Sequence, residues 1–209
     1  MRVYNPIDQG IRRFDKLLKA LLPEKADCSV FPFVDNTMLS AAERQHSAKL
    51  MRINHSGEIC AQALYLGQAL TARGQDLADQ LSLAAKEEQD HLNWCKTRIE
   101  ELGGRPSFLN PLWRLGSFII GSTAGLMGDK ISLGFLAETE QQVSRHLDKH
   151  LEEMSLNDEK SRAILAQMQL DEQKHATNAL TLGGIPFPKP ARAIMSALSK
   201  VMTCTTRFF

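Results

Sequence analysis

Apolar residues recur at intervals of three and four over long stretches of this 209-residue chain, and few stretches alternate in the manner of β-strands. The pattern predicts an all-α protein with four long helices, at about residues 40–73, 76–102, 129–155 and 157–182. Short gaps within the first pair and within the second pair predict two antiparallel hairpins. Residues 103–128 then form a long connection between the second and third helices.

Several residues mark where these helices should begin and end. Ser40 and Glu43 have the spacing of a capping box at the start of the first helix. Asn157 or Asp158 can cap the fourth helix, and the glycine pair 103–104 ends the second. These signals agree with the periodicity, so the helix bounds rest on two independent features of the sequence.

The apolar side of the second helix contains a glutamate and a histidine one turn apart. Helical phase places Glu88 and His91 on this side, whereas Glu87 and Asp90 point elsewhere. The apolar stripe that defines the phase consists of Leu81, Ala84, Ala85, Leu92, Cys95 and Ile99. A Glu-x-x-His motif is therefore expected to face the core.

The other three helices place acidic residues inward by the same test. The fourth helix repeats the motif with Glu172 and His175. The third directs Glu140 inward and leaves Glu138 off its stripe, and the first directs Glu58 inward. Each half of the chain thus supplies one glutamate followed by Glu-x-x-His.

Four carboxylates within one core require compensating positive charge. Isolated buried carboxylates repel one another and lose their hydration, at a cost of several kcal/mol each. Two divalent metal ions would neutralise four carboxylates and leave two neutral imidazoles as nitrogen ligands. This ligand set is that of ferritin-like di-iron or di-manganese proteins, and it leaves open positions for dioxygen. The predicted ligands are Glu58, Glu88, His91, Glu140, Glu172 and His175.

The remaining histidines carry weaker signals. His55 either supports a nearby metal ligand or simply occupies a helix face. His146 lies to the side of the apolar stripe of the third helix, which predicts a surface position. His46 and His150 are expected to lie in solvent.

Charge and cysteine content narrow the function further. Lys and Arg total 25 against 24 for Asp and Glu, so no overall field favours nucleic acid. The four cysteines include no C-x-x-C pair, which gives no zinc motif and predicts a reducing compartment. Charges interrupt the apolar residues at the N-terminus, so a cleaved secretory signal is not expected.

The long connection and both ends of the chain have amphipathic character. Arg114 and Asp129 bound the longest charge-free run of the connection, which is shorter than the roughly 18 residues that a membrane span needs. The connection is expected either to be buried or to lie at a membrane surface. We divide the chain into an N-terminal amphipathic extension (1–39), the bundle (40–184) and a basic amphipathic C-terminal segment (185–209), whose ends suit an anionic membrane surface or a partner helix.

The sequence resembles the bacterial demethoxyubiquinone hydroxylases, which are ferritin-like di-iron proteins. The resemblance covers about residues 45–182 and rests on RINHSGEICAQALYLGQ, EEQDHLNWC, NPLWRLGSFIIGSTAGLMG, ETEQQVSRHL and DEQKHA. It implies the same six metal ligands, with Glu88 and Glu172 bridging two iron ions. It also implies that His146 lies on the substrate side, near the quinone.

The implied reaction is the hydroxylation of a polyprenyl demethoxyubiquinol ring by dioxygen, with NADH or quinol as the reductant. The resemblance further implies a peripheral protein on the cytoplasmic face of the cell membrane, acting on a polyprenyl benzoquinol, with a homo-oligomer or another ubiquinone-biosynthesis protein as possible partners. The alternative is a ferritin-like iron-binding protein or ferroxidase. A ribonucleotide reductase subunit would need a tyrosine near the metals, and Tyr65, about 10 Å along the helix from Glu58, is the only candidate.

Overall fold

The computed structural model describes residues 38–207, and within this range the chain forms six α-helices and no β-strand. The helices are α2 (Ala41–Thr71), α3 (Gln75–Glu101), α4 (Asn110–Leu126), α5 (Asp129–Glu153), α6 (Glu159–Thr181) and α7 (Lys189–Thr206). The all-α prediction is confirmed for the described residues. The four predicted long helices correspond closely to α2, α3, α5 and α6.

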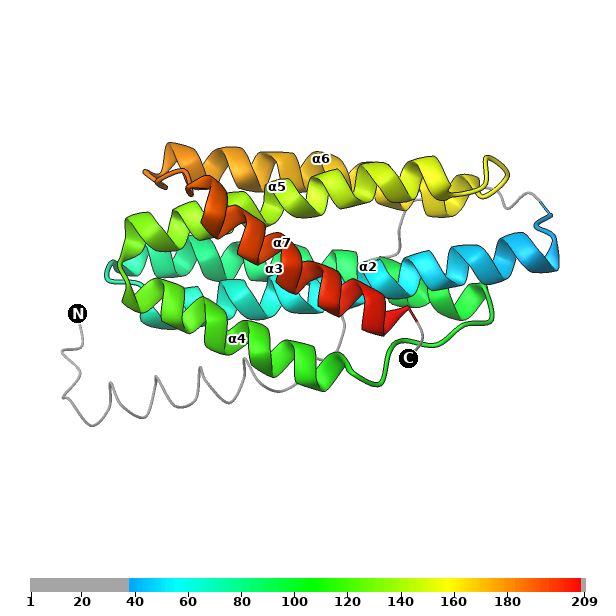
Figure 1. Ribbon diagram of the computed structural model, residues 1–209, viewed down its shortest axis with the longest axis horizontal. Coiled ribbons are helices and arrows are strands. Elements are labelled where there is room, and N and C mark those ends of the chain that lie inside the picture. The colour runs from blue at the N-terminus through cyan, green and yellow to red at the C-terminus, as the bar shows by residue number, and fades with distance from the viewer. Residues whose placement is uncertain (1–37, 208–209) are drawn as a thin grey trace.

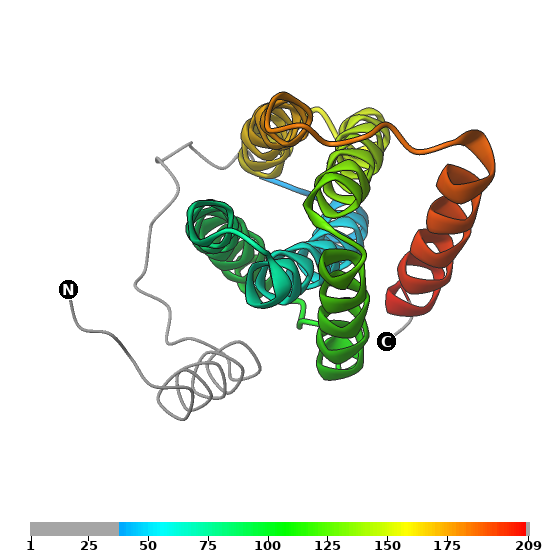
Figure 2. The same cartoon turned by 90° about the vertical axis from the view of Figure 1, so that its left-hand side faces the viewer.

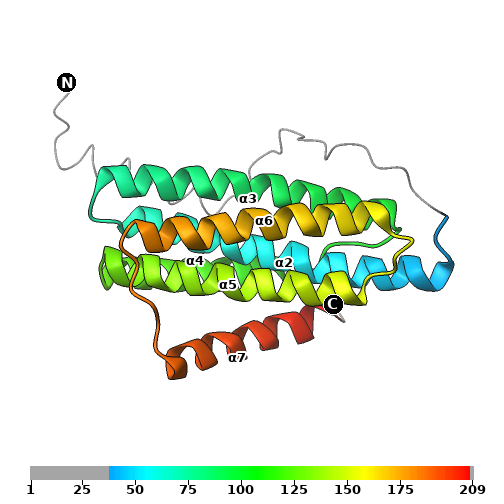
Figure 3. The same ribbon diagram turned by 90° about the horizontal axis from the view of Figure 1, so that it is seen from above.

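Two antiparallel hairpins, α2–α3 and α5–α6, pack side by side as a four-helix bundle of the ferritin-like type (Figure 1). Helix α4 lies along the outer side of α2 and connects the hairpins. Viewed along the bundle, α7 lies outside the four helices (Figure 2) and is inclined to them (Figure 3). Both additional helices contact α2 and α5.

The predicted helix caps are present and are tied to the rest of the bundle. The side chains and backbones of Ser40 and Glu43 form the full capping box at the start of α2. The Asp158 carboxylate caps α6 by accepting a hydrogen bond from the Ser161 amide at 3.1 Å. It also pairs with buried Arg98 of α3 at 2.7 Å, which joins the two hairpins at this end of the bundle.

Helix α4 makes an unusually close approach to α2. A Cβ atom on Gly121 would lie 2.3 Å from the Leu64 carbonyl oxygen, and one on Gly67 would lie 2.4 Å from the Phe118 carbonyl oxygen. Such distances exclude any side chain at these two glycines. One face of the connection thus packs on α2, whereas the opposite face exposes Leu112, Leu115, Ile119 and Leu126. The connection is an amphipathic helix, and the alternative of a buried segment is wrong for this outer face.

Two apolar clusters fill the bundle on either side of its middle. The Met51 cluster includes Met51, Cys95, Ile99, Leu147, Leu165 and Met168. The Leu81 cluster includes Tyr65, Leu81, Ala85, Leu133, Leu136 and Ala179. Every one of the four bundle helices contributes to both clusters, and the predicted metal ligands lie between them along each helix.

No helix within residues 38–207 combines the length and the apolar content required to cross a bilayer. The predicted amphipathic extension at residues 1–39 falls almost entirely outside the described part of the chain. The division of the chain at residues 40 and 185 stays a prediction.

Candidate metal centre

Six side chains from the four bundle helices converge between the two apolar clusters. Their carboxylates are at most 1% exposed, and the two histidines are 2% and 8% exposed. They form two groups, each with its nitrogen and oxygen atoms within 4.8 Å of one another. The first group is Glu58, Glu88, His91 and Glu172, and the second is Glu88, Glu140, Glu172 and His175. The structure thus brings together all six residues that the sequence predicted as ligands.

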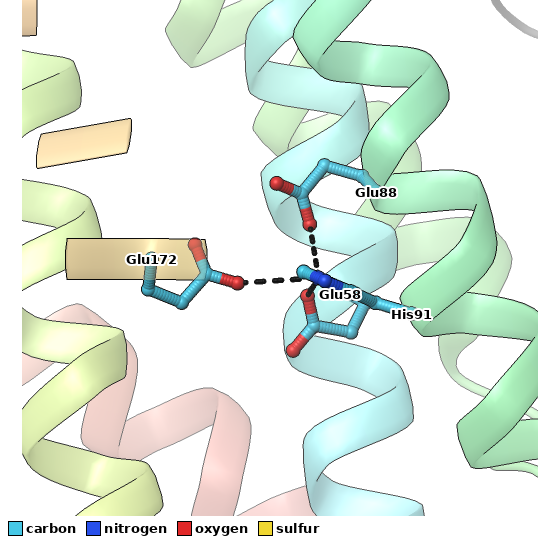
Figure 4. A group of neighbouring side chains, drawn as sticks. All are labelled: Glu58, Glu88, His91 and Glu172. Carbon is cyan, nitrogen blue, oxygen red and sulfur yellow. Dashed lines mark ion pairs between the residues drawn. The ribbon is translucent and has the colours of Figure 1, made fainter. Parts of the chain in front are cut away.

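The first group is arranged around the inner nitrogen of His91 (Figure 4). His91 Nδ1 lies 3.3 Å from Glu88 Oε2, 3.3 Å from Glu172 Oε1 and 3.7 Å from Glu58 Oε2. These side chains come from three different helices, so only the assembled bundle creates the group.

The second group repeats this arrangement around His175. Its Nδ1 atom lies 3.2 Å from Glu88 Oε1 and 3.5 Å from Glu172 Oε2. Each shared glutamate therefore directs one oxygen towards His91 and the other towards His175. A carboxylate placed in this way can bridge two metal ions.

Among the described residues, the buried polar atoms at this centre make no hydrogen bond of good geometry, although the histidine nitrogens and carboxylate oxygens lie near one another. The atoms are Oε2 of Glu58, both carboxylate oxygens of Glu88, Glu140 and Glu172, and Nδ1 of His91 and His175. Such groups are costly to bury unless a charged partner compensates them. Four carboxylates and two imidazoles fit two divalent metal ions in both charge and donor type.

Burial and mutual repulsion perturb the acids of this centre. Burial is the largest cause that raises the pKa of Glu58 and Glu140 well above the usual value. The charges of Glu172 and Glu88 raise both values further. The carboxylates of Glu58 and Glu140 thus hold protons more readily when no cation lies beside them.

The histidines and Glu88 respond in the opposite direction. Burial would lower the pKa of His175, but Glu172 and Glu88 outweigh it and raise the value to about 12. Burial would likewise raise the pKa of Glu88, but His175 and His91 lower it to about 2. The histidines and Glu88 thus favour the charged form of one another, and a metal bound at Nδ1 would displace a proton held there.

Two acidic residues outside the six were missed by sequence reasoning. Glu87 Oε2 lies 2.8 Å from Nε2 of His175, and Asp171 Oδ2 lies 3.5 Å from Nε2 of His91. Each acid directly precedes the ligand glutamate of its own helix but contacts the histidine of the other hairpin. Carboxylates in such positions fix the ring orientation of a metal-bound histidine. The signal in the sequence was the acid that precedes both Glu-x-x-His motifs.

The structure corrects the prediction that His150 lies in solvent. His150 is buried and its Nδ1 atom lies 2.7 Å from Asn54 Oδ1, because its position three residues after Leu147 places it on the same inner face. Burial lowers its pKa to about 3. His46 is partly exposed, and its Nε2 atom lies 3.2 Å from the Glu153 carbonyl oxygen.

His55 is buried beside the start of α4 and does not belong to either ligand group. Its Nδ1 atom lies 3.3 Å from the Asn110 side-chain nitrogen, and Asn110 Oδ1 accepts a hydrogen bond of 2.6 Å from Ser56. Burial lowers the pKa of His55 to about 4. These contacts join α4 to the turn of α2 that precedes Glu58.

The packing of α7 over α5 changes the predicted position of two residues. Glu138 is buried rather than exposed, because Arg145 at 3.2 Å and Arg192 of α7 at 4.0 Å cover it. His146 is half-buried and lines a groove of about 650 Å³ between α5 and α7. Its ring centroid lies 4.0 Å from that of His150, and it belongs to neither of the two groups of converging side chains.

Tyr65 lies closer to the centre than its position on α2 suggested. It is 1% exposed, and its ring packs edge to face against His175 with the centroids 5.9 Å apart. Burial and the nearby charge of Glu140 raise the pKa of its phenol well above the usual value. The predicted separation from Glu58 took no account of the second group, whose residues come from other helices.

A polar pocket of about 330 Å³ opens between α3 and α6, on the side of the outer nitrogens (Nε2) of His91 and His175. Its lining is rich in charge and consists of Glu87, Asp90, His91, Trp94, Asp171, Lys174, His175 and Asn178. Water and ions can therefore approach the centre from this side more readily than through the apolar clusters.

The sequence is similar to one family of known proteins. Residues 45–206 match the family model described as ubiquinone biosynthesis protein COQ7. The chain is 52% identical to a 3-demethoxyubiquinol 3-hydroxylase of Ralstonia pickettii, with 94% of this chain and 97% of the relative covered. It is 51% identical to the protein of the same name from Ectopseudomonas mendocina, over 98% of this chain and 97% of the relative.

Proposed function

This chain belongs to the COQ7 family of ubiquinone biosynthesis proteins, and we propose on that basis that it is a di-iron monooxygenase that hydroxylates the ring of a polyprenyl demethoxyubiquinol. Both relatives are named 3-demethoxyubiquinol 3-hydroxylase, and the chain aligns with nearly the full length of each. The observation that carries the proposal is the pair of overlapping buried ligand groups, which shares two carboxylates between two sites.

The ligand assignment follows from the geometry of the two groups. Glu88 and Glu172 would bridge the two iron ions, because each presents one oxygen to either group. Glu58 with His91 and Glu140 with His175 would complete the two sites. Once bound and reduced, the iron ions would supply the activation of dioxygen that an organic ring cannot achieve alone.

The protein's own residues would position the metals and limit the access of water along the bundle. Glu87 and Asp171 hold the outer nitrogens of the two histidines, so that both inner nitrogens face the centre. The apolar clusters on either side limit water, which strengthens the electrostatic interactions within the site.

The groove between α5 and α7 is the place we propose for the quinol. At about 650 Å³ it is large enough for the ring, and it includes the Nε2 atom of His146, which is buried without a hydrogen bond from the described residues. His146 contacts His150, which bonds Asn54 one turn before Glu58 on α2. His146 would thus orient a ring hydroxyl on the substrate side of the centre.

A polyprenyl substrate lies in a membrane, and the two outer helices present suitable surfaces. Helix α4 exposes Leu112, Leu115, Ile119 and Leu126, and α7 exposes Ile194, Leu198 and Val201 beside three basic residues. We infer peripheral binding to the cytoplasmic face of the cell membrane through these surfaces. NADH or quinol as the reductant, and assembly with further copies or with another biosynthetic protein, belong to the same proposal.

The decisive experiment removes the gene from its host and measures the quinones that accumulate. We expect demethoxyubiquinone in place of ubiquinone, restoration by the wild-type gene, and no restoration by Glu172→Ala. Purified wild-type protein should hold two irons per chain and hydroxylate the added quinol. Normal ubiquinone in a host without a redundant enzyme would contradict the proposal, and an iron-filled protein shell would favour the ferroxidase alternative.

A further inference from the structure

A second, apolar pocket reaches the centre from the end of the bundle. It has a volume of about 170 Å³ and is lined mainly by Leu77, Leu81, Leu133, Leu136, Ala179 and Leu182. Tyr65 and His175 also line it, and both are nearly fully buried. We propose that this pocket is the route by which dioxygen reaches the metals, an inference that rests on the proposed function because that reaction consumes dioxygen.

The polarity of the pocket distinguishes it from its neighbour. Glu87, His175 and Asn178 line both this pocket and the polar pocket between α3 and α6, so the two spaces adjoin. Leucine side chains dominate one space, whereas Asp90, Asp171 and Lys174 give the other its charge. Apolar cavities in proteins stay dry and accept small apolar molecules such as xenon. Dioxygen therefore partitions into the leucine-lined space, and water and ions enter the polar one.

The size of the apolar pocket excludes the quinol as its main occupant. Its volume of about 170 Å³ is roughly a quarter of that of the groove between α5 and α7. Pockets that hold drug-sized molecules usually measure about 300–1,000 Å³. A diatomic molecule needs far less space, and a substituted ring with a polyprenyl tail needs more.

The position of the pocket makes the route specific to one half of the centre. The pocket is lined by His175 of the second group but not by His91 of the first. His175 is 8% exposed against 2% for His91, which agrees with an opening on that side. Leu83 and Leu182 are 59% and 47% exposed and give the entrance an apolar rim. Dioxygen would therefore arrive beside Glu140 and His175.

Xenon binding tests the pocket directly and without any catalytic turnover. Crystals of the iron-loaded protein under xenon pressure should show a xenon atom between Leu81 and Leu136. Failure of xenon to bind at this position, while it binds elsewhere in the same crystals, would overturn the proposal.

Filling the pocket tests the route itself. Ala84 lines the pocket and Ala69 does not, yet both are half-buried against the Leu81 cluster, so Ala69→Leu is the matched control for Ala84→Leu. The ferrous protein is mixed with dissolved dioxygen without quinol, and its oxidation is followed by stopped flow. We expect Ala84→Leu to slow oxidation about tenfold and Ala69→Leu to leave it unchanged. Leu83→Trp at the exposed rim provides a second variant with little risk to folding, and it should slow oxidation as well.

The outcomes separate this inference from the proposed function. Oxidation at the wild-type rate in both Ala84→Leu and Leu83→Trp, with two irons bound, would overturn the dioxygen route. A higher quinol KM in these variants with unchanged oxidation would assign the pocket to the quinol instead. Slower oxidation in both, in a protein that never hydroxylates a quinol, would support the route while contradicting the proposed function.

Discussion

The two halves of the bundle place the same kinds of side chain at the candidate metal centre but surround them differently. Helices α2 and α3 contribute Glu58, Glu88 and His91, and α5 and α6 contribute Glu140, Glu172 and His175. The first group borders the Met51 cluster and the polar pocket between α3 and α6, where the ring centroid of Trp94 lies 5.3 Å from that of His91. The second group faces Tyr65 and the apolar pocket.

This difference shows that ligand identity and access are separate properties of the fold. The repeated spacing of glutamate and histidine fixes which side chains meet in the middle of the bundle. Access depends on the small and large side chains one or two turns away, and these are not repeated between the halves. On the proposed route, a nearly symmetric centre would receive dioxygen from one side.

The largest effect should follow from removing what the halves share. Glu172→Ala deletes a carboxylate that belongs to both groups, so we expect the iron content to fall from two per chain to below one and hydroxylation to be lost. Metal analysis and a hydroxylation assay check this outcome. Glu100→Ala, at an exposed position on α3, is the control and should retain both metals. Full iron content in Glu172→Ala would refute its role as a bridge.

A smaller effect should distinguish the halves through the two acids that contact Nε2 of the histidines. Glu87→Gln and Asp171→Asn weaken the support of His175 and His91, respectively, and each should reduce metal affinity by about 10- to 100-fold. Because the Glu87 contact is 2.8 Å and the Asp171 contact is 3.5 Å, Glu87→Gln should disturb the second site more strongly. Cobalt titrations monitored by absorption would resolve the two sites. Equal weakening of both sites by either variant would contradict the crosswise assignment.

The smallest effect concerns a contact between the halves, the one between His150 of α5 and Asn54 of α2. Burial lowers the pKa of His150 to about 3 in the folded protein, so the unfolded chain binds the additional proton first as the pH falls. The stability that the neutral ring contributes is complete above about pH 6.5 and declines from there towards pH 3. Its loss at pH 5 amounts to about 2 kcal/mol.

His150→Asn should therefore flatten the dependence of stability on pH between 7 and 5. Urea unfolding of the metal-free wild type and variant at both pH values measures the difference. The wild type should lose more stability than the variant over this interval. Identical slopes for the two proteins would show that His150 does not stay neutral in the folded state.

The sequence was sufficient for the features that depend on one helix at a time. The bounds of the four bundle helices and the inward direction of Glu58, Glu88, Glu140 and Glu172 follow from periodicity within each helix. The burial of Glu138 could not be found in this way, because Arg192 of α7 covers it after the helices have packed. The contacts of Glu87, Asp171 and Tyr65 likewise depend on residues far away in the sequence.

The crosswise contacts have a consequence for how the protein is assembled. Glu87 of one hairpin holds His175 of the other, and Asp171 returns the interaction to His91. Neither hairpin alone contains a complete candidate metal site with its supporting acid. Each site therefore forms only when both hairpins are packed together. If the chain were divided between α4 and α5 and the two fragments were produced separately, stable metal binding would show that the fragments had associated. The proposed metal centre would thus also report whether the two hairpins have assembled correctly.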